Sequence, residues 1–91
     1  MMKIKFAKIK PKNTLEEQRH KIFEELVEVD EILFFDDDFD QERLEDELFD
    51  IMQACVSFLV KLESDIEAIN KRHLKKIENY VKTGRIKLDN N

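Results

Sequence analysis

Two short groups of acidic residues have the spacing of a divalent-cation site. The first is Glu24-Glu25-Leu26-Val27-Glu28 and the second is Glu47-Leu48-Phe49-Asp50, with 18 residues between them. Residues three or four positions apart share a face of a helix, so two adjacent helices would bring four or five carboxylates to one place. Carboxylates that close repel each other, and Mg²⁺ or Mn²⁺ would neutralise them. An acidic face exposed to solvent is the alternative.

The composition favours a single small domain built from helices. The chain has 91 residues, of which 41% are charged and 42% are hydrophobic, with one Gly and one Pro. Such a composition is typical of helical proteins. A chain of this length buries a modest share of its surface alone. We therefore expect a homodimer or homotetramer whose copies together complete a core of the four-helix-bundle type.

Charge and cysteine content limit the partners and the compartment. The net charge is −5, which argues against nucleic acid as a partner. No apolar run approaches the length of a membrane span and no signal peptide is visible, so we expect no membrane contact. Cys55 is the only cysteine and lies in an apolar stretch. These features predict a buried thiol and a cytoplasmic protein.

The first helix is expected over residues 14–34. Thr14-Leu15-Glu16-Glu17 has the sequence of a capping box, which marks a helix start. At about 100° per residue, apolar side chains form one stripe and three glutamates lie on its flank. The stripe contains Leu15, Ile22, Leu26, Val29 and Leu33, and the flank contains Glu24, Glu25 and Glu28.

Two further helices are expected over residues 41–63 and 65–83. In the first of these, Glu47 and Asp50 lie one turn apart beside the apolar face. Residues 52–60 are apolar nearly all round, which indicates burial between two helical layers or two subunits. A second capping box at Ser64-Asp65-Ile66-Glu67 favours a new helix that Gly84 ends. One continuous helix through residues 41–83 stays an alternative.

The two ends of the chain are expected to lie outside the helices. Residues 1–12 contain five Lys and no acid, and their partial alternation of polar and apolar residues fits a short strand or a basic arm. Residues 84–91 form a tail in which Arg85-Ile86-Lys87-Leu88 alternates again and could pair with residues 3–9. The predicted fold is all-α, a helical hairpin plus a third helix, with possible short strands at the ends.

The two acidic motifs and their spacing resemble the all-α nucleoside triphosphate pyrophosphohydrolases. This superfamily includes MazG-like proteins, dimeric dUTPases and phosphoribosyl-ATP pyrophosphohydrolase. The resemblance covers roughly Leu15 to Arg85, so the chain is expected to be one MazG-like domain. It implies that Mg²⁺, or Mn²⁺, at the acidic cluster holds a nucleoside triphosphate. Water would cleave the substrate to nucleoside monophosphate and pyrophosphate, as in the housecleaning of nucleotide pools.

The resemblance also implies roles for individual acidic residues. Glu25, Glu28, Glu47 and Asp50 match the metal-ligand positions of the superfamily. Glu24 matches the first glutamate of the motif and would orient a water molecule or the ligands. The expected catalytic residues are therefore Glu24 and Glu28.

Five further residues are expected to bind the substrate. Lys21 lies one helical turn before the acidic motif and could hold a phosphate or pair with a nearby glutamate. Gln18 could reach the nucleotide base. Asn79, Lys82 and Arg85 resemble the basic and amide residues that members of the superfamily carry near the nucleotide. A solvated basic face at a helix C-terminus is the alternative for these three.

Two other functions stay open from the sequence. One is a non-catalytic helical oligomer that binds a protein or a nucleotide through its charged faces. The other is phosphoribosyl-ATP hydrolysis, which is the same chemistry on one dedicated substrate. The motifs do not select among nucleotides.

Overall fold

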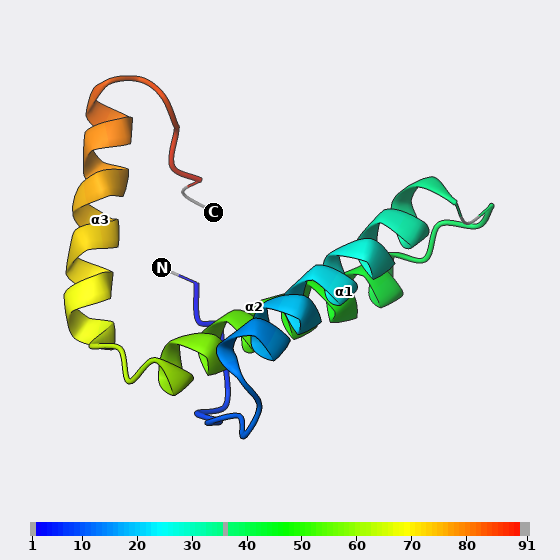
Figure 1. Ribbon diagram of the computed structural model, residues 1–91. Helices are drawn as coiled ribbons and strands as arrows, with labels where there is room; N and C mark the ends of the chain where they lie inside the picture. The colour runs from blue at the N-terminus through cyan, green and yellow to red at the C-terminus, as the bar shows by residue number, and fades with distance from the viewer. Residues whose placement is uncertain (1, 36, 90–91) are drawn as a thin grey trace.

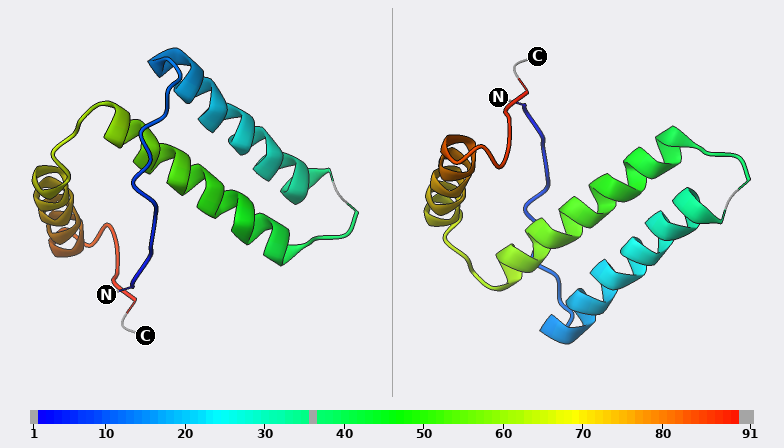
Figure 2. Two further views of the ribbon diagram at one scale, coloured as in Figure 1. Left: turned by 90° about the horizontal axis from the view of Figure 1, so that it is seen from below. Right: turned by 90° about the horizontal axis from the view of Figure 1, so that it is seen from above.

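The computed structural model describes residues 2–35 and 37–89, and all of the secondary structure in them is helical (Figure 1). Helix α1 spans Leu15–Phe34, α2 spans Gln41–Lys61 and α3 spans Ile66–Lys82. α1 and α2 lie side by side as an antiparallel hairpin, while α3 stands apart beyond the C-terminal end of α2 (Figures 1 and 2). None of the described helices combines the length and the apolar character that a membrane crossing requires.

Each helix begins at a side chain that caps its first N–H groups. The Glu17 N–H donates to Thr14 Oγ1, and the Thr14 N–H donates to Glu17 Oε1, both at 3.1 Å. This confirms the capping box predicted for the first helix. Asp40 caps α2 and Asp65 caps α3, each by accepting a 3.1 Å hydrogen bond from the N–H three residues ahead. The cap of α3 thus lies one residue after the Ser64 of the predicted box.

α2 and α3 are separate helices because the chain turns sharply at Glu63, whose φ of 56° is in the left-handed region. The Ser64 N–H donates to the Leu59 carbonyl at 3.1 Å, and the Glu63 N–H donates to the Val60 carbonyl at 3.0 Å. These two bonds close the end of α2 in the manner of a Schellman motif. Gly84, with φ of 75°, ends α3 in the same manner, as the sequence predicts.

The terminal strands predicted from the sequence do not form in the described residues. Residues 2–12 instead run across α2 as an extended arm (Figure 2). The Ala7 N–H donates to Gln53 Oε1 at 2.8 Å, and Gln53 Nε2 donates to the Ala7 carbonyl at 2.9 Å. These bonds to a helix side chain take the place of the ladder that a second strand would supply, which is why the predicted pairing with residues 85–88 is wrong.

The hairpin packs through a seam of side chains between α1 and α2. The less exposed positions of both helices recur every third or fourth residue, which is the spacing of helices packed side by side. The less exposed positions that follow this spacing, which define the seam, are Gln18, Ile22, Glu25, Val29 and Ile32 in α1, and Leu44, Glu47, Ile51, Ala54 and Phe58 in α2. Of the described apolar residues, Ile32 and Ala54 are the buried ones. The apolar core of a single chain is therefore small.

The apolar stripe predicted for α1 meets α2 only in part, because Ile22 and Val29 lie in the seam and the other three residues do not. Leu15, Leu26 and Leu33 of that stripe are each nearly half exposed. Cys55, which the sequence placed in a buried region, is also exposed. Both expectations fail because α3 does not fold back over the hairpin, so these faces lie open in a single chain.

α3 has an apolar face that the described residues leave largely open. It contains no buried residue, and its Ile66, Leu74 and Val81 are exposed. The radius of gyration is 15.9 Å, whereas a compact domain of this length has about 12 Å. A single chain is thus an open arrangement of a hairpin and a separate helix.

Gln18 fastens the two helices of the hairpin to each other. Its side chain is 2% exposed, and its Nε2 donates to the Ala54 carbonyl at 2.9 Å. Substituting Gln18→Leu should lower the free energy of unfolding by about 1–3 kcal/mol, because it removes this bond and leaves the Asn13 amide without its acceptor. Gln41→Leu, on the exposed first residue of α2, should change it by less than about 0.5 kcal/mol. Urea unfolding followed by circular dichroism measures both, and equal losses would contradict this role of Gln18.

Candidate metal centre

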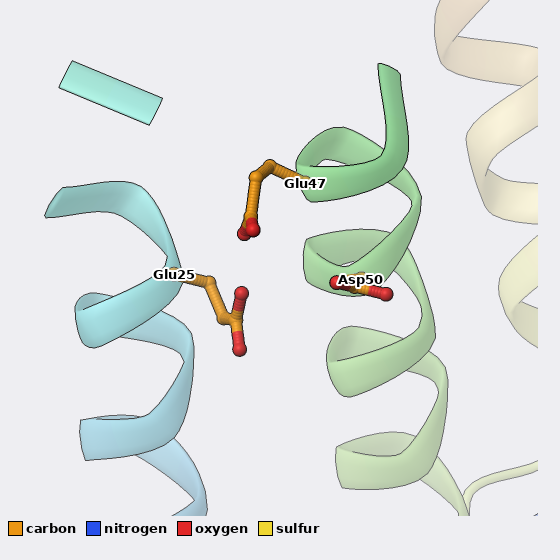
Figure 3. Close-up of side chains that lie close together, drawn as sticks. All are labelled: Glu25, Glu47 and Asp50. Atoms are coloured by element: carbon orange, nitrogen blue, oxygen red, sulfur yellow. The ribbon is translucent and has the colours of Figure 1, made fainter. Parts of the chain in front are cut away.

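Three carboxylates from α1 and α2 form the acidic cluster, which we define as Glu25, Glu47 and Asp50. Glu25 and Glu47 point toward each other between the two helices, and Asp50 lies one turn further along α2 (Figure 3). One oxygen of each residue lies within 4.8 Å of the other two. Oxygens on opposite sides of a bound Mg²⁺ are about 4 Å apart, so small side-chain rotations would fit the cluster to one ion.

The helical spacing places these side chains. Glu25 follows Ile22 by three residues and Glu47 precedes Ile51 by four, so both glutamates occupy positions of the seam and are half-buried. Asp50, three residues after Glu47, lies on the same side of α2 and is exposed. The sequence predicted a cluster on the flank of the packing face, whereas the structure has its two glutamates within that face.

The surroundings of Glu47 favour its protonated form when no cation is bound. Its Oε2 is buried and has no hydrogen-bond partner among the described residues. Glu25, within hydrogen-bonding reach, is the largest influence on the pKa of Glu47; burial and Glu28 raise the pKa further, to about 7. An ionised carboxylate can only accept a hydrogen bond. A hydrogen bond between Glu47 and a neighbouring ionised carboxylate therefore needs a proton on Glu47. A bound cation would replace that proton.

The remaining glutamates of the first motif lie on different sides of α1. Glu28 is half-buried and close enough to Glu47 to raise its pKa, so it borders the acidic cluster. Glu24 is exposed and forms an ion pair with His20, with 3.0 Å between Oε1 and Nε2. The structure does not bring Glu24, predicted as catalytic, into the cluster. One residue of offset turns a side chain about 100° around the helix, away from α2.

A pocket of about 380 Å³, lined by both polar and apolar groups, adjoins the acidic cluster. Its lining comes from α1, α2 and the arm with the residues that follow it, and comprises Gln18, Lys21, Glu25, Asp50, Gln53, Ala54, Ser57, Ile9, Pro11 and Asn13. The volume lies in the range of small-ligand pockets. Glu25 and Gln18 are seven residues apart, so the pocket extends along the hairpin for about 10 Å. Carboxylates line one end, and amide and hydroxyl groups line the other.

Lys21 and Gln18, both predicted to bind substrate, line this pocket in different ways. Lys21 is exposed and has no ion pair in the part of the chain that the structure describes, so its charge is available to an anion. The ion pair with a glutamate one turn away, the alternative for Lys21, does not form. The Gln18 side chain is engaged at both ends, because Asn13 Nδ2 donates to its Oε1 at 2.8 Å and its Nε2 bonds Ala54. Gln18 therefore shapes the wall of the pocket.

The predicted substrate residues Asn79, Lys82 and Arg85 do not approach the acidic cluster of their own chain. The turn at Glu63 carries α3 away from α1, as Figure 1 shows. The Arg85 guanidinium lies over the Tyr80 ring, 5.2 Å from its centroid. These residues could meet an acidic cluster only in a second copy of the chain.

The arm and its partner Gln53 are the pocket residues that the sequence analysis missed. A signal for them exists in the sequence, because Gln53 and Ser57 interrupt the otherwise apolar stretch of α2. Polar side chains in such a stretch need hydrogen-bond partners, and here Gln53 finds them in the arm and in Ser57.

Comparisons of the chain with protein-family models, with curated proteins and with solved structures found no match. The function must therefore be inferred from the acidic cluster and the pocket beside it.

The pKa of Glu47 leads to a prediction about stability without metal. A carboxyl whose pKa rises from 4.5 unfolded to about 7 folded stabilises the fold while it is protonated, so stability should fall as pH rises from about 4.5 to about 7. Glu47→Gln should remove this part of the pH dependence and be more stable than wild type at pH 8. Thermal unfolding in EDTA at pH 5.5 and pH 8 tests this. The control is Glu45→Gln, which changes an exposed acid on the opposite face of α2. If Glu47→Gln lost as much stability between pH 5.5 and pH 8 as this control does, the prediction would be wrong.

Proposed function

We propose that the protein is a Mg²⁺-dependent nucleoside triphosphate pyrophosphohydrolase. The observation that carries the proposal is the convergence of Glu25, Glu47 and Asp50 beside a pocket of small-ligand size. A carboxylate cluster needs positive charge, and a triphosphate needs its negative charge neutralised, so one bound cation meets both needs. The resemblance of the two acidic motifs to the superfamily points to the same chemistry.

The cluster residues fit a hard divalent cation. Their donor atoms are carboxylate oxygens, which Mg²⁺ and Mn²⁺ prefer. Glu47 Oε2 is buried without a partner in the part of the chain that the structure describes, and a cation would satisfy it. Glu25, Glu47 and Asp50 would hold the ion, with Glu28 at its edge. When bound, the ion would neutralise phosphate oxygens and lower the pKa of a coordinated water.

Two residues of the chain would serve the reaction beside the cluster. Glu28 borders Glu47 and would take a proton from the water that attacks the α-phosphorus. The bond between the α-phosphorus and the bridging oxygen breaks, and pyrophosphate leaves. Lys21, exposed in the pocket wall, would bind a phosphate oxygen. The products are a nucleoside monophosphate and pyrophosphate.

A second copy of the chain would cover the open apolar faces. Leu26 of α1, Leu48 of α2 and Leu74 of α3 are exposed in a single chain, and burying such side chains is the main favourable term in association. A homodimer or homotetramer would thereby complete a helical bundle. It would also offer the only route for Lys82 or Arg85 to reach an acidic cluster.

The open apolar faces equally favour the alternative function, a non-catalytic helical oligomer that binds a protein or nucleotide. Such a protein needs the exposed surfaces but does not need Glu25, Glu47 and Asp50 to converge. A measurement of pyrophosphate release therefore separates the two functions.

With Mg²⁺ or Mn²⁺, the protein should release pyrophosphate from at least one member of a panel of nucleoside triphosphates and phosphoribosyl-ATP. Glu28→Gln and Asp50→Asn should each lower the rate by about 10²- to 10⁴-fold, because they remove a proton acceptor and a metal ligand. Glu45→Gln, which removes an acid of α2 outside the cluster, should keep the parental rate. Parental rates in both cluster variants would exclude the catalytic proposal. An inactive parent that melts at a higher temperature with Mg²⁺ would favour the binding protein.

The chain should sediment as a dimer or tetramer at micromolar concentration. Placing a charge on one exposed apolar face, as in Leu74→Glu, should dissociate the assembly because the charge would be buried unpaired. Lys75→Glu, a charge change at the next residue of α3, is the matched control and should not. A wild-type protein that sediments as a monomer would contradict this assembly.

A further inference from the structure

The arm, residues 2–12, is fastened to α2 chiefly by one side chain, that of Gln53. The Gln53 amide accepts from the Ala7 N–H at 2.8 Å and donates to the Ala7 carbonyl at 2.9 Å, as a neighbouring strand would. Its Nε2 also donates to Ser57 Oγ at 3.0 Å. With both ends of the amide engaged, the side chain has one orientation. Gln53 therefore sets where the middle of the arm lies.

Three further contacts hold the arm on either side of this point, one of which is the 2.9 Å hydrogen bond that Lys10 Nζ donates to Glu63 Oε1. The Phe6 ring packs against the Phe49 ring, with 5.6 Å between centroids. Further along the arm, Lys61 Nζ donates to the Pro11 carbonyl at 3.1 Å. The segment between these contacts is thus held in place across α2 (Figure 2).

The fastened arm supplies one wall of the pocket beside the acidic cluster. Ile9 and Pro11 line the pocket, as does Asn13, which follows the arm. The Asn13 orientation is fixed through Gln18, whose own amide must donate to the Ala54 carbonyl and so accepts from Asn13 Nδ2. Asn13 Oδ1 is left buried without a partner among the described residues. The wall therefore combines apolar surface with an acceptor that no described residue uses.

We infer that Gln53 is a positioning residue that docks the arm over the pocket, where Ile9, Pro11 and Asn13 contact the nucleoside part of the substrate. This inference rests on the proposed function, which places the phosphates at the carboxylate end of the pocket. The pocket extends about 10 Å from that end, so the rest of the ligand reaches the wall that the arm forms. The arm also carries five Lys and no acid, which favours an anionic substrate.

Loss of the docked arm should weaken substrate binding more than it slows the chemistry. The seam between α1 and α2 and the acidic cluster are built without the arm. A molecule whose arm is undocked is therefore folded but lacks one wall of its pocket. The apparent affinity is multiplied by the fraction of molecules that keep the arm docked, so KM rises, while the rate at which bound substrate reacts stays the same.

The test compares Gln53→Ala with Gln41→Ala, the same substitution at an exposed position of α2 that does not touch the arm. Gln53→Ala should raise KM for the preferred nucleotide on the order of tenfold, because two hydrogen bonds to the arm are lost. Its kcat should stay within about twofold of the parent. Lys61→Met, which removes the donor to Pro11 but lies outside the pocket, should raise KM in the same direction by less.

A second readout needs no substrate. Mn²⁺ is paramagnetic and broadens the NMR signals of nuclei near it, so Mn²⁺ at the acidic cluster should broaden the Ile9 and Asn13 amide signals in the parent. Gln53→Ala should restore the Ile9 signal as the arm leaves, while signals of α1 beside Glu25 stay broad.

The outcomes separate this inference from the hydrolase proposal. A parent that is inactive on the whole panel overturns both. An active parent whose KM is unchanged by Gln53→Ala and Lys61→Met, or an Ile9 signal that Mn²⁺ broadens equally in parent and variant, overturns the role of the arm alone. If Gln53→Ala does not fold, Lys61→Met carries the same comparison.

Discussion

The repulsion between two carboxylates in the seam of the hairpin is the constraint on which the rest of this structure depends. Glu25 and Glu47 occupy positions where a helical pair ordinarily has apolar side chains, and Glu28 adds a third charge nearby. The helices can pack at this level only if a proton or a cation reduces the negative charge. The raised pKa of Glu47 reflects the uptake of a proton, and the proposed metal would supply the cation. The packing of the helices and the candidate site therefore depend on the same repulsion.

Outside this seam, the faces of the hairpin are only partly covered by the rest of the chain. The left-handed turn at Glu63, at a cost of about 1 kcal/mol for a non-Gly residue, directs α3 away from α1. The arm covers part of α2 through hydrogen bonds to Gln53 together with the packing of Phe6 on Phe49. A segment held by a few polar bonds can determine a pocket wall without determining the stability of the fold.

Much of the fold follows from local sequence signals, and the errors occur where packing decides. Thr14, Asp40 and Asp65 start helices because their side chains reach N–H groups three residues ahead. The alternation in residues 3–9 predicted a strand because periodicity does not reveal which hydrogen-bond partner a segment will meet. Here the partner is Gln53, 46 residues from Ala7, and no local pattern connects the two.

The sequence by itself determined the helical segments, the start of α1 and the two acidic motifs, since these depend on contacts within one turn of a helix, whereas the break between α2 and α3 stayed open until the turn at Glu63 was seen. Only the tertiary structure decided which side of α1 meets α2. Leu26 of the predicted stripe lies open, and the seam includes Glu25 while Glu24 lies beside His20. Stripe and seam share Ile22 and Val29, so their centres differ by about half of the 100° that one residue adds. Which side of α1 meets α2 depends on contacts between residues far apart in the sequence, such as the hydrogen bond from Gln18 to Ala54. Neighbouring residues in the sequence do not encode these contacts.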